Sequence, residues 1–144
     1  MKCSRRIAII AALVACIGLA DSGYLTIKHL QGAYIRCEGD CSAVLGSRYA
    51  EGIAGVPLAG FGAMAYGIVI ISASLAACGV SIGRRIFSVM GIIMALFSVW
   101  LIYLQAFVIH AFCKYCLASA AVCFTLAALV VIDRVFCRPS RVAP

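Results

Sequence analysis

The sequence is poor in charge. Only 12% of its 144 residues are Asp, Glu, Lys or Arg, and just five of these are acidic, whereas soluble domains carry about 25% charged residues. Hydrophobic residues make up 65% of the chain, and the mean hydropathy is +1.12. A soluble fold could not bury so much apolar surface, so we expect the bilayer to be the solvent of most of the chain.

The chain also lacks Gly/Ser-rich linkers, low-complexity tracts and convincing internal repeats. Its length fits a single membrane domain, residues 1–144. The net charge of +7 could indicate nucleic-acid binding. The basic residues, however, flank apolar runs and form no stripe with interleaved aromatic residues, which favours membrane topology as their explanation.

Four segments have the length of about 20 apolar residues that a helix needs to cross the hydrocarbon core. They are residues 7–29, 58–80, 86–109 and 112–132. The sequence therefore predicts an all-α integral membrane protein with a four-transmembrane-helix bundle. The connection at 30–57 is long and polar, and the other two, 81–85 and the few residues around Cys113, are short.

The placement of Lys and Arg predicts the orientation. Eight of the twelve basic residues fall on one side of the four-span plan, which the positive-inside rule makes cytoplasmic. They are Lys2, Arg5, Arg6, Arg84, Arg85, Arg134, Arg138 and Arg141. Both termini are then cytoplasmic, and the long loop faces the periplasmic or extracellular side of the cytoplasmic (inner) membrane. A lipoprotein signal ending in LVAC at Cys16 is the alternative for the N-terminus, but the apolar pattern continues past Cys16.

Four of the nine cysteines form two close pairs on the predicted outward side. Cys37 and Cys41 lie in the long loop, and Cys113 and Cys116 form a C-x-x-C at the start of the fourth span. The outer compartment is oxidising, so disulfides persist there. The other five, Cys3, Cys16, Cys78, Cys123 and Cys137, receive no function; those within spans are typical of small buried hydrophobes.

Three interpretations of the outward pairs remain: a redox relay, inert structural disulfides, or a four-thiolate zinc site. A C-x-x-C bridge closes a very small loop and contributes little stability by loop entropy, which favours the redox interpretation. Cys113 is expected near water at a helix N-terminus beside Lys114, where the helix dipole and the charge stabilise a thiolate. Cys116 lies one turn deeper, towards a site for a lipid-soluble acceptor such as a quinone.

Three stretches resemble the bacterial homologues of vitamin K epoxide reductase. They are GLADSGYLTIKH at 18–29, CSAVLGSRYAEGIAGVPLAGFGAMAYG at 41–67 and YLQAFVIHAFCKYCLAS at 103–119. All three occur in order on the same four-span plan. The resemblance implies four helices around a quinone, capped by the loop and its short helix.

The resemblance also implies roles for individual residues. Cys37 and Cys41 resemble the loop pair that accepts electrons from a thioredoxin-like, DsbA-type envelope protein, and Cys113 and Cys116 resemble the pair at the active site. Cys41 would exchange with Cys113, while Cys116 would contact the quinone, ubiquinone or menaquinone. Ser47 matches a serine or threonine near that site. The chain ends at Pro144 without a fused thioredoxin-like domain, so we expect the partner to act in trans.

The chain departs from the vertebrate members at one position. Their quinone-binding asparagine falls close to Leu58, so quinone reduction is a better expectation than epoxide reduction. Other hydrogen-bond donors must then hold the quinone, and the candidates are Tyr66, Tyr103, Tyr115 and His110; anchoring at the membrane interface is the alternative role for each. The unrelated disulfide-bond-formation protein B carries its two cysteine pairs in the reverse order.

Asp21 is a carboxylate within an apolar span, which is a sign of function by default. The alternative is a structural role in which Asp21 bonds Ser22 or a neighbouring helix, and this is the interpretation that the sequence favours. A small transporter would need polar groups deep in several spans, and only Asp21, Gln105 and scattered Ser and Thr are available.

Overall fold

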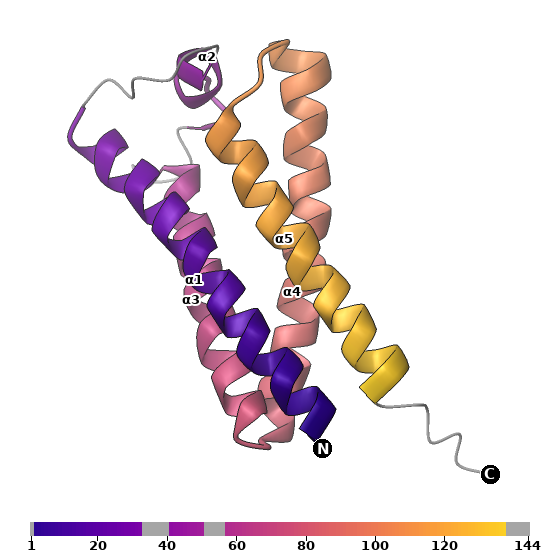
Figure 1. Cartoon of the computed structure of the whole chain (residues 1–144). Helices are drawn as coiled ribbons and strands as arrows, with labels where there is room; N and C mark the ends of the chain where they lie inside the picture. The colour runs from indigo at the N-terminus through magenta and orange to yellow at the C-terminus, as the bar shows by residue number, and fades with distance from the viewer. Residues whose placement is uncertain (1, 33–40, 51–56, 138–144) are drawn as a thin grey trace.

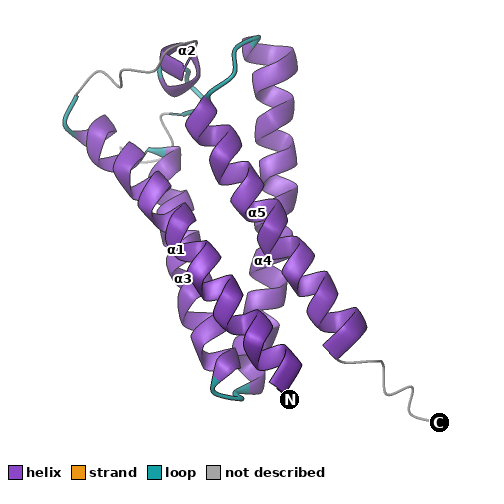
Figure 2. Cartoon of the chain, in the orientation of Figure 1, coloured by secondary structure: helices purple, strands orange, loops and turns teal. Residues whose placement is uncertain are grey.

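The structure is a computed structural model that describes residues 2–32, 41–50 and 57–137. Within these ranges it contains no strand, and four helices are long and apolar enough to cross a membrane. They span Lys2–Leu30, Leu58–Ala77, Ser81–Ile109 and Lys114–Cys137. The predicted all-α, four-span fold is therefore confirmed, and Figure 2 shows how little of the described chain is not helical.

The helices follow one another in simple order along the chain. They are α1 (Lys2–Leu30), α2 (Cys41–Leu45), α3 (Leu58–Ala77), α4 (Ser81–Tyr103), the π-helix η1 (Leu104–Ile109), α5 (Lys114–Ile132) and the π-helix η2 (Asp133–Cys137). The two π-helices continue α4 and α5, so each pair forms one span.

The four long helices form a closed bundle (Figure 1). Helix α1 packs against α3 and α5, and α4 packs against α3 and α5 on the other side. The short helix α2 lies over one end of the bundle and contacts η1, close to the turn that leads into α5. A short helix in the long loop is thus confirmed.

The connection between α3 and α4 differs from the prediction. It consists of Cys78–Val80, and α4 begins at Ser81, so the segment 81–85 is helical. Gly79 has a φ of +90°, which lets the chain reverse within three residues. Hydropathy placed the boundary at the two arginines of this segment, but long basic side chains are tolerated at helix ends because they reach the interface.

Small residues line the inward face of α1. Ala11, Ala15 and Gly18 are buried against the core, in which Tyr66 and Leu126 are fully buried. A Cβ atom at Gly18 would overlap the Tyr66 ring, so the absence of a side chain there permits the close approach of α1 and α3. The large apolar side chains that remain exposed around the bundle suit contact with lipid.

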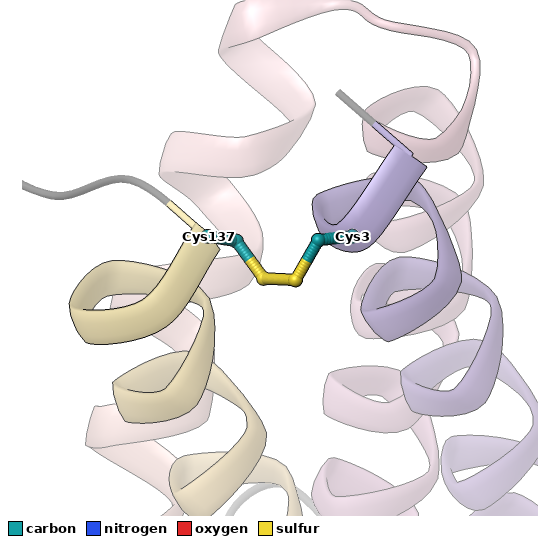
Figure 3. The surroundings of a disulfide bond; sticks show 2 residues. All are labelled: Cys3 and Cys137. Carbon is teal, nitrogen blue, oxygen red and sulfur yellow. A yellow bond between two sulfur atoms is a disulfide. The ribbon is translucent and has the colours of Figure 1, made fainter.

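A disulfide bond joins the two ends of the described chain (Figure 3). Cys3 at the start of α1 and Cys137 at the end of η2 are bonded, with Cα atoms 5.6 Å apart. The bond lies at the end of the bundle opposite to α2. The α3–α4 connection lies at the same end as the bond. The sequence assigned no partner to either cysteine, because a separation of 134 residues leaves no local signal.

Candidate active site

A cavity of about 460 Å³ lies inside the bundle near the α2 end. Side chains of α1, α3, α4, η1, α5 and the segment 44–50 line it, and most of its surface is apolar. The backbone N–H of Leu58 donates to the carbonyl of Ala50 at 3.0 Å, which ties this segment to the start of α3. The volume and the apolar lining with a few polar groups are typical of a site for a small organic molecule.

The C-x-x-C motif forms the N-terminal cap of α5. Cys113 has an extended backbone and precedes the helix, and its Sγ accepts a hydrogen bond from the N–H of Cys116 at 3.4 Å. This is the position at which a capping side chain satisfies an otherwise unpaired amide. Cys113 lies at the helix N-terminus, as the sequence predicted, and an anionic sulfur would be stabilised at this place.

The two sulfurs have different surroundings. Cys113 is completely buried in a cluster with Val44 and Ala111, whereas Cys116 is half-buried and lines the cavity. The expectation that Cys113 faces water is wrong, because Val44 of α2 packs over it. The expectation that Cys116 faces a site for a lipid-soluble molecule agrees with its place in the cavity wall.

Gln105 is a site residue that the sequence analysis missed. Its side chain is only 3% exposed, and its Oε1 accepts the N–H of Cys113 at 2.9 Å. Its backbone carbonyl accepts the N–H of Ala111 at 3.1 Å, where the chain turns through His110 with a φ of 57°. A polar residue near the end of an apolar span, eight positions before the C-x-x-C, was the available signal.

The structure describes only part of the loop pair, Cys37 and Cys41. Cys37 lies outside the described residues, and for Cys41 the structure describes the backbone, which begins α2, but not the side chain. Val44, one turn later on α2, packs in the cluster of Cys113. The pairing of Cys41 with Cys113 stays a prediction, as does the zinc alternative, which needs all four outward cysteines.

Two of the five predicted quinone-binding residues line the cavity. The Ser47 hydroxyl donates to the carbonyl of Val44 at 2.7 Å. The Tyr66 hydroxyl bonds the side chain of Ser119 at 2.8 Å and the sulfur of Cys123 at 3.2 Å. Cys123 therefore lines the cavity with a defined partner, although the sequence gave it only a packing role. Leu58, at the position of the vertebrate asparagine, also lines the cavity.

The structure does not bring the other three candidates into the cavity lining. Tyr103 is exposed beside Phe107, with ring centroids 5.0 Å apart. Tyr115 packs near Tyr24 with centroids 6.0 Å apart, and His110 forms the left-handed turn after η1. A role for these residues in holding a quinone stays a prediction.

Comparison with known protein families identifies the family of the chain. Residues 9–131 match the model of the vitamin K epoxide reductase family. The chain belongs to this family. No curated protein sequence matches the chain. As a member of the vitamin K epoxide reductase family it is an integral membrane oxidoreductase that acts on thiols and disulfides. The family uses quinones and generally works with thioredoxin-like partners, so its known chemistry fits a C-x-x-C motif beside an apolar cavity.

Proposed function

We propose that the protein is a quinone-dependent thiol oxidase that re-oxidises a thioredoxin-like, DsbA-type envelope protein and so supports disulfide bond formation. One observation carries the proposal. The two cysteines of one C-x-x-C contact different surroundings: Cys116 lines the apolar cavity, and Cys113 packs beneath α2, the helix that begins at Cys41. A relay between a protein partner and a lipid-soluble acceptor requires this division.

The cavity suits a quinone head group in volume and polarity. Apolar walls such as Leu58 and Met94 would hold the ring, and Ser47 and Tyr66 are the predicted binding residues that line the same space. A bound quinone would supply the electron acceptor, which takes up two electrons and two protons to become the quinol. Ubiquinone and menaquinone both meet this requirement.

The proposed relay consists of thiol–disulfide exchanges that conserve two electrons. The reduced partner attacks the Cys37–Cys41 disulfide and leaves oxidised. The thiolate of Cys41 attacks Cys113 and releases Cys116 as a thiolate. Cys37 then attacks Cys41, which re-forms the loop disulfide and frees Cys113. Oxidation of the Cys113–Cys116 dithiol to a disulfide releases the two electrons at the cavity, along with two protons.

The start of α5 favours the release of a thiolate in this relay. The N–H of Cys116, in the first turn of the helix, donates to the Cys113 sulfur, and the exposed Lys114 adds positive charge next to Cys113. Both effects favour the thiolate over the thiol. The Cys113 thiolate, the leaving group of the last exchange, is therefore stabilised where it forms.

We also propose the sidedness of the protein. The α1 N-terminus, the α3–α4 connection and the end of η2 lie at one end of the bundle (Figure 1), so six of the basic residues near them, Lys2 among them, are brought together. The other five are Arg5, Arg6, Arg84, Arg85 and Arg134. The positive-inside rule makes this end cytoplasmic and the C-x-x-C end extracytoplasmic, where a thioredoxin-like envelope protein can reach the loop.

Replacing one loop cysteine tests the relay. In detergent or in vesicles, Cys37→Ala should block electron transfer from a reduced thioredoxin-like oxidase to a quinone. Transfer from a small dithiol such as dithiothreitol should persist, because it can reduce Cys113–Cys116 directly. The matched control is Cys78→Ala, an exposed cysteine outside the cavity lining that makes no disulfide. Unchanged transfer from the protein donor in Cys37→Ala would contradict the relay.

A further inference from the structure

Asp21 has a carboxylate oxygen for which the described residues provide no partner. The residue lines the cavity from α1, and its Oδ2 atom is buried without a hydrogen bond there. The sequence favoured a structural bond from Asp21 to Ser22 or to a neighbouring helix, and Oδ2 makes neither bond within the described residues. The Ser22 hydroxyl donates instead to the carbonyl of Gly18 at 2.6 Å. Asp21 is half-buried, and a carboxylate oxygen that is buried in a membrane span without a partner is costly, which points to a function.

Asp21 lies at nearly the same depth as Cys116. The rings of Tyr24 on α1 and Tyr115 on α5 are 6.0 Å apart, which aligns the two antiparallel helices. From this level Asp21 is three residues deeper along α1, and Cys116 is one residue deeper along α5. At a rise of about 1.5 Å per residue, the two residues differ in depth by about 3 Å. Both line the same cavity, so one ligand can contact both.

The histidine of the cavity wall is too far from Asp21 to exchange a proton with it directly. His29 lies eight residues later on α1, about 12 Å nearer to the α2 end. His29 also lines the cavity, and it is exposed. The wall between the two residues contains Leu25, which is apolar and holds no proton.

We infer that Asp21 is the proton donor to the quinone oxygen that forms on reduction in the cavity. The inference rests on the proposed function. Cys113 and Cys116 supply two electrons as their dithiol becomes a disulfide, and they release two protons towards the α2 end. The Asp21 carboxylic acid gives its proton to one quinol oxygen, and the other oxygen takes a proton from water. The Asp21 carboxylate then regains a proton from water, so two protons are released and two are taken up.

The test uses single-turnover reduction of a short-chain ubiquinone or menaquinone by the pre-reduced protein. Asp21→Asn keeps the shape and a hydrogen-bonding group but has no carboxyl proton. We expect its rate of quinol formation to fall about 10²-fold, the usual contribution of a positioned acid. Asp21→Glu should recover most of the rate. Thr26→Ala is the matched control on the same helix, because the Thr26 hydroxyl is bonded to the carbonyl of Ser22 and the residue is outside the cavity lining.

Two further readouts separate proton donation from other roles. Quinone binding to the oxidised protein, followed by tryptophan quenching, should be unchanged in Asp21→Asn. Infrared difference spectra of the wild type should show a protonated carboxyl band that changes on quinol formation and is missing in Asp21→Asn. A wild-type spectrum without this change, or wild-type turnover in Asp21→Asn, would overturn the inference while leaving the proposed function in place. Failure of the wild-type protein to form quinol would overturn both.

Discussion

The Oε1 atom of Gln105 accepts the backbone N–H of Cys113 at 2.9 Å. Through its carbonyl, the same residue also accepts the N–H of Ala111 at 3.1 Å. Gln105 thereby bonds both sides of the turn that carries the chain from η1 into α5. A π-helix often occurs at a functional site, and here it directs a polar side chain of an apolar span towards the cysteine that caps the next helix.

Gln105→Leu should disturb the C-x-x-C without unfolding the bundle. The substitution leaves the buried N–H of Cys113 without an acceptor, which costs about 1–3 kcal/mol. We expect the reduction of the Cys113–Cys116 pair by dithiothreitol to slow at least about tenfold, because the turn no longer fixes the cap. Rapid-mixing thiol assays measure this rate.

The control for Gln105 is Ser74→Ala, which removes an exposed hydroxyl that bonds the carbonyl of Ile70 within its own helix. It should leave the rate unchanged. Gln105→Glu retains an acceptor atom and should recover part of the rate. A wild-type rate in Gln105→Leu would show that the bond to Cys113 does not position the motif.

The same substitution, Gly to Ala, should have opposite effects on stability at two glycines of α1. Gly18→Ala places a Cβ against the Tyr66 ring, whereas nothing lies within 4 Å of a Cβ at Gly23. Gly18→Ala should lower the free energy of unfolding by about 1–3 kcal/mol through overpacking. It should also raise the KM for quinone, because Tyr66 lines the cavity. Gly23→Ala should stabilise α1 slightly. Thermal unfolding in detergent compares them, and equal effects would contradict the packing described.

The Cys3–Cys137 bond should stabilise the oxidised protein. It ties α1 to η2 across a separation of 134 residues. Chain entropy sets an upper limit of about 5 kcal/mol for a loop of this length. The effect should be smaller here, because helices that stay inserted in the membrane keep the unfolded chain ordered. Cys3→Ser and Cys137→Ser should each lower the unfolding temperature measured without reductant.

Cys78→Ser is the matched control for this bond, because Cys78 is exposed at the same end and makes no disulfide. With dithiothreitol present, the wild type should unfold at the temperature of the two serine variants. The proposed sidedness places the bond in the cytoplasm, where thiols are kept reduced, so alkylation in intact cells should find the two thiols more accessible than in the purified, oxidised protein. If Cys78→Ser destabilises as much as Cys3→Ser, the bond is not the cause.

Hydropathy was sufficient to predict the membrane fold. Transmembrane helices are set by runs of apolar residues, so a one-dimensional reading gives their number and approximate bounds. The motif FCKYC likewise indicated its place at the start of α5. The error at Ser81 has the same origin, because the arginines that lower the hydropathy of 81–85 do not prevent that segment from being helical.

The details of the site depended on packing, which hydropathy does not record. Val44 covers Cys113 because α2 folds over the bundle end. Tyr66 bonds Cys123 because α3 and α5 present these residues to the same cavity. The Cys3–Cys137 bond joins opposite ends of the sequence. Each relationship is set by which helix faces meet, and a single sequence gives no pairing between faces.

The central claim is that Cys116 passes electrons from the relay to a quinone in the cavity. The most direct test follows quinol formation spectroscopically, with purified protein, a reduced thioredoxin-like oxidase and a quinone. Cys116→Ala should abolish quinol formation, whereas Cys16→Ala, an exposed cysteine of α1 outside the cavity lining, should leave it intact. Quinol formation by Cys116→Ala at the wild-type rate would contradict the account.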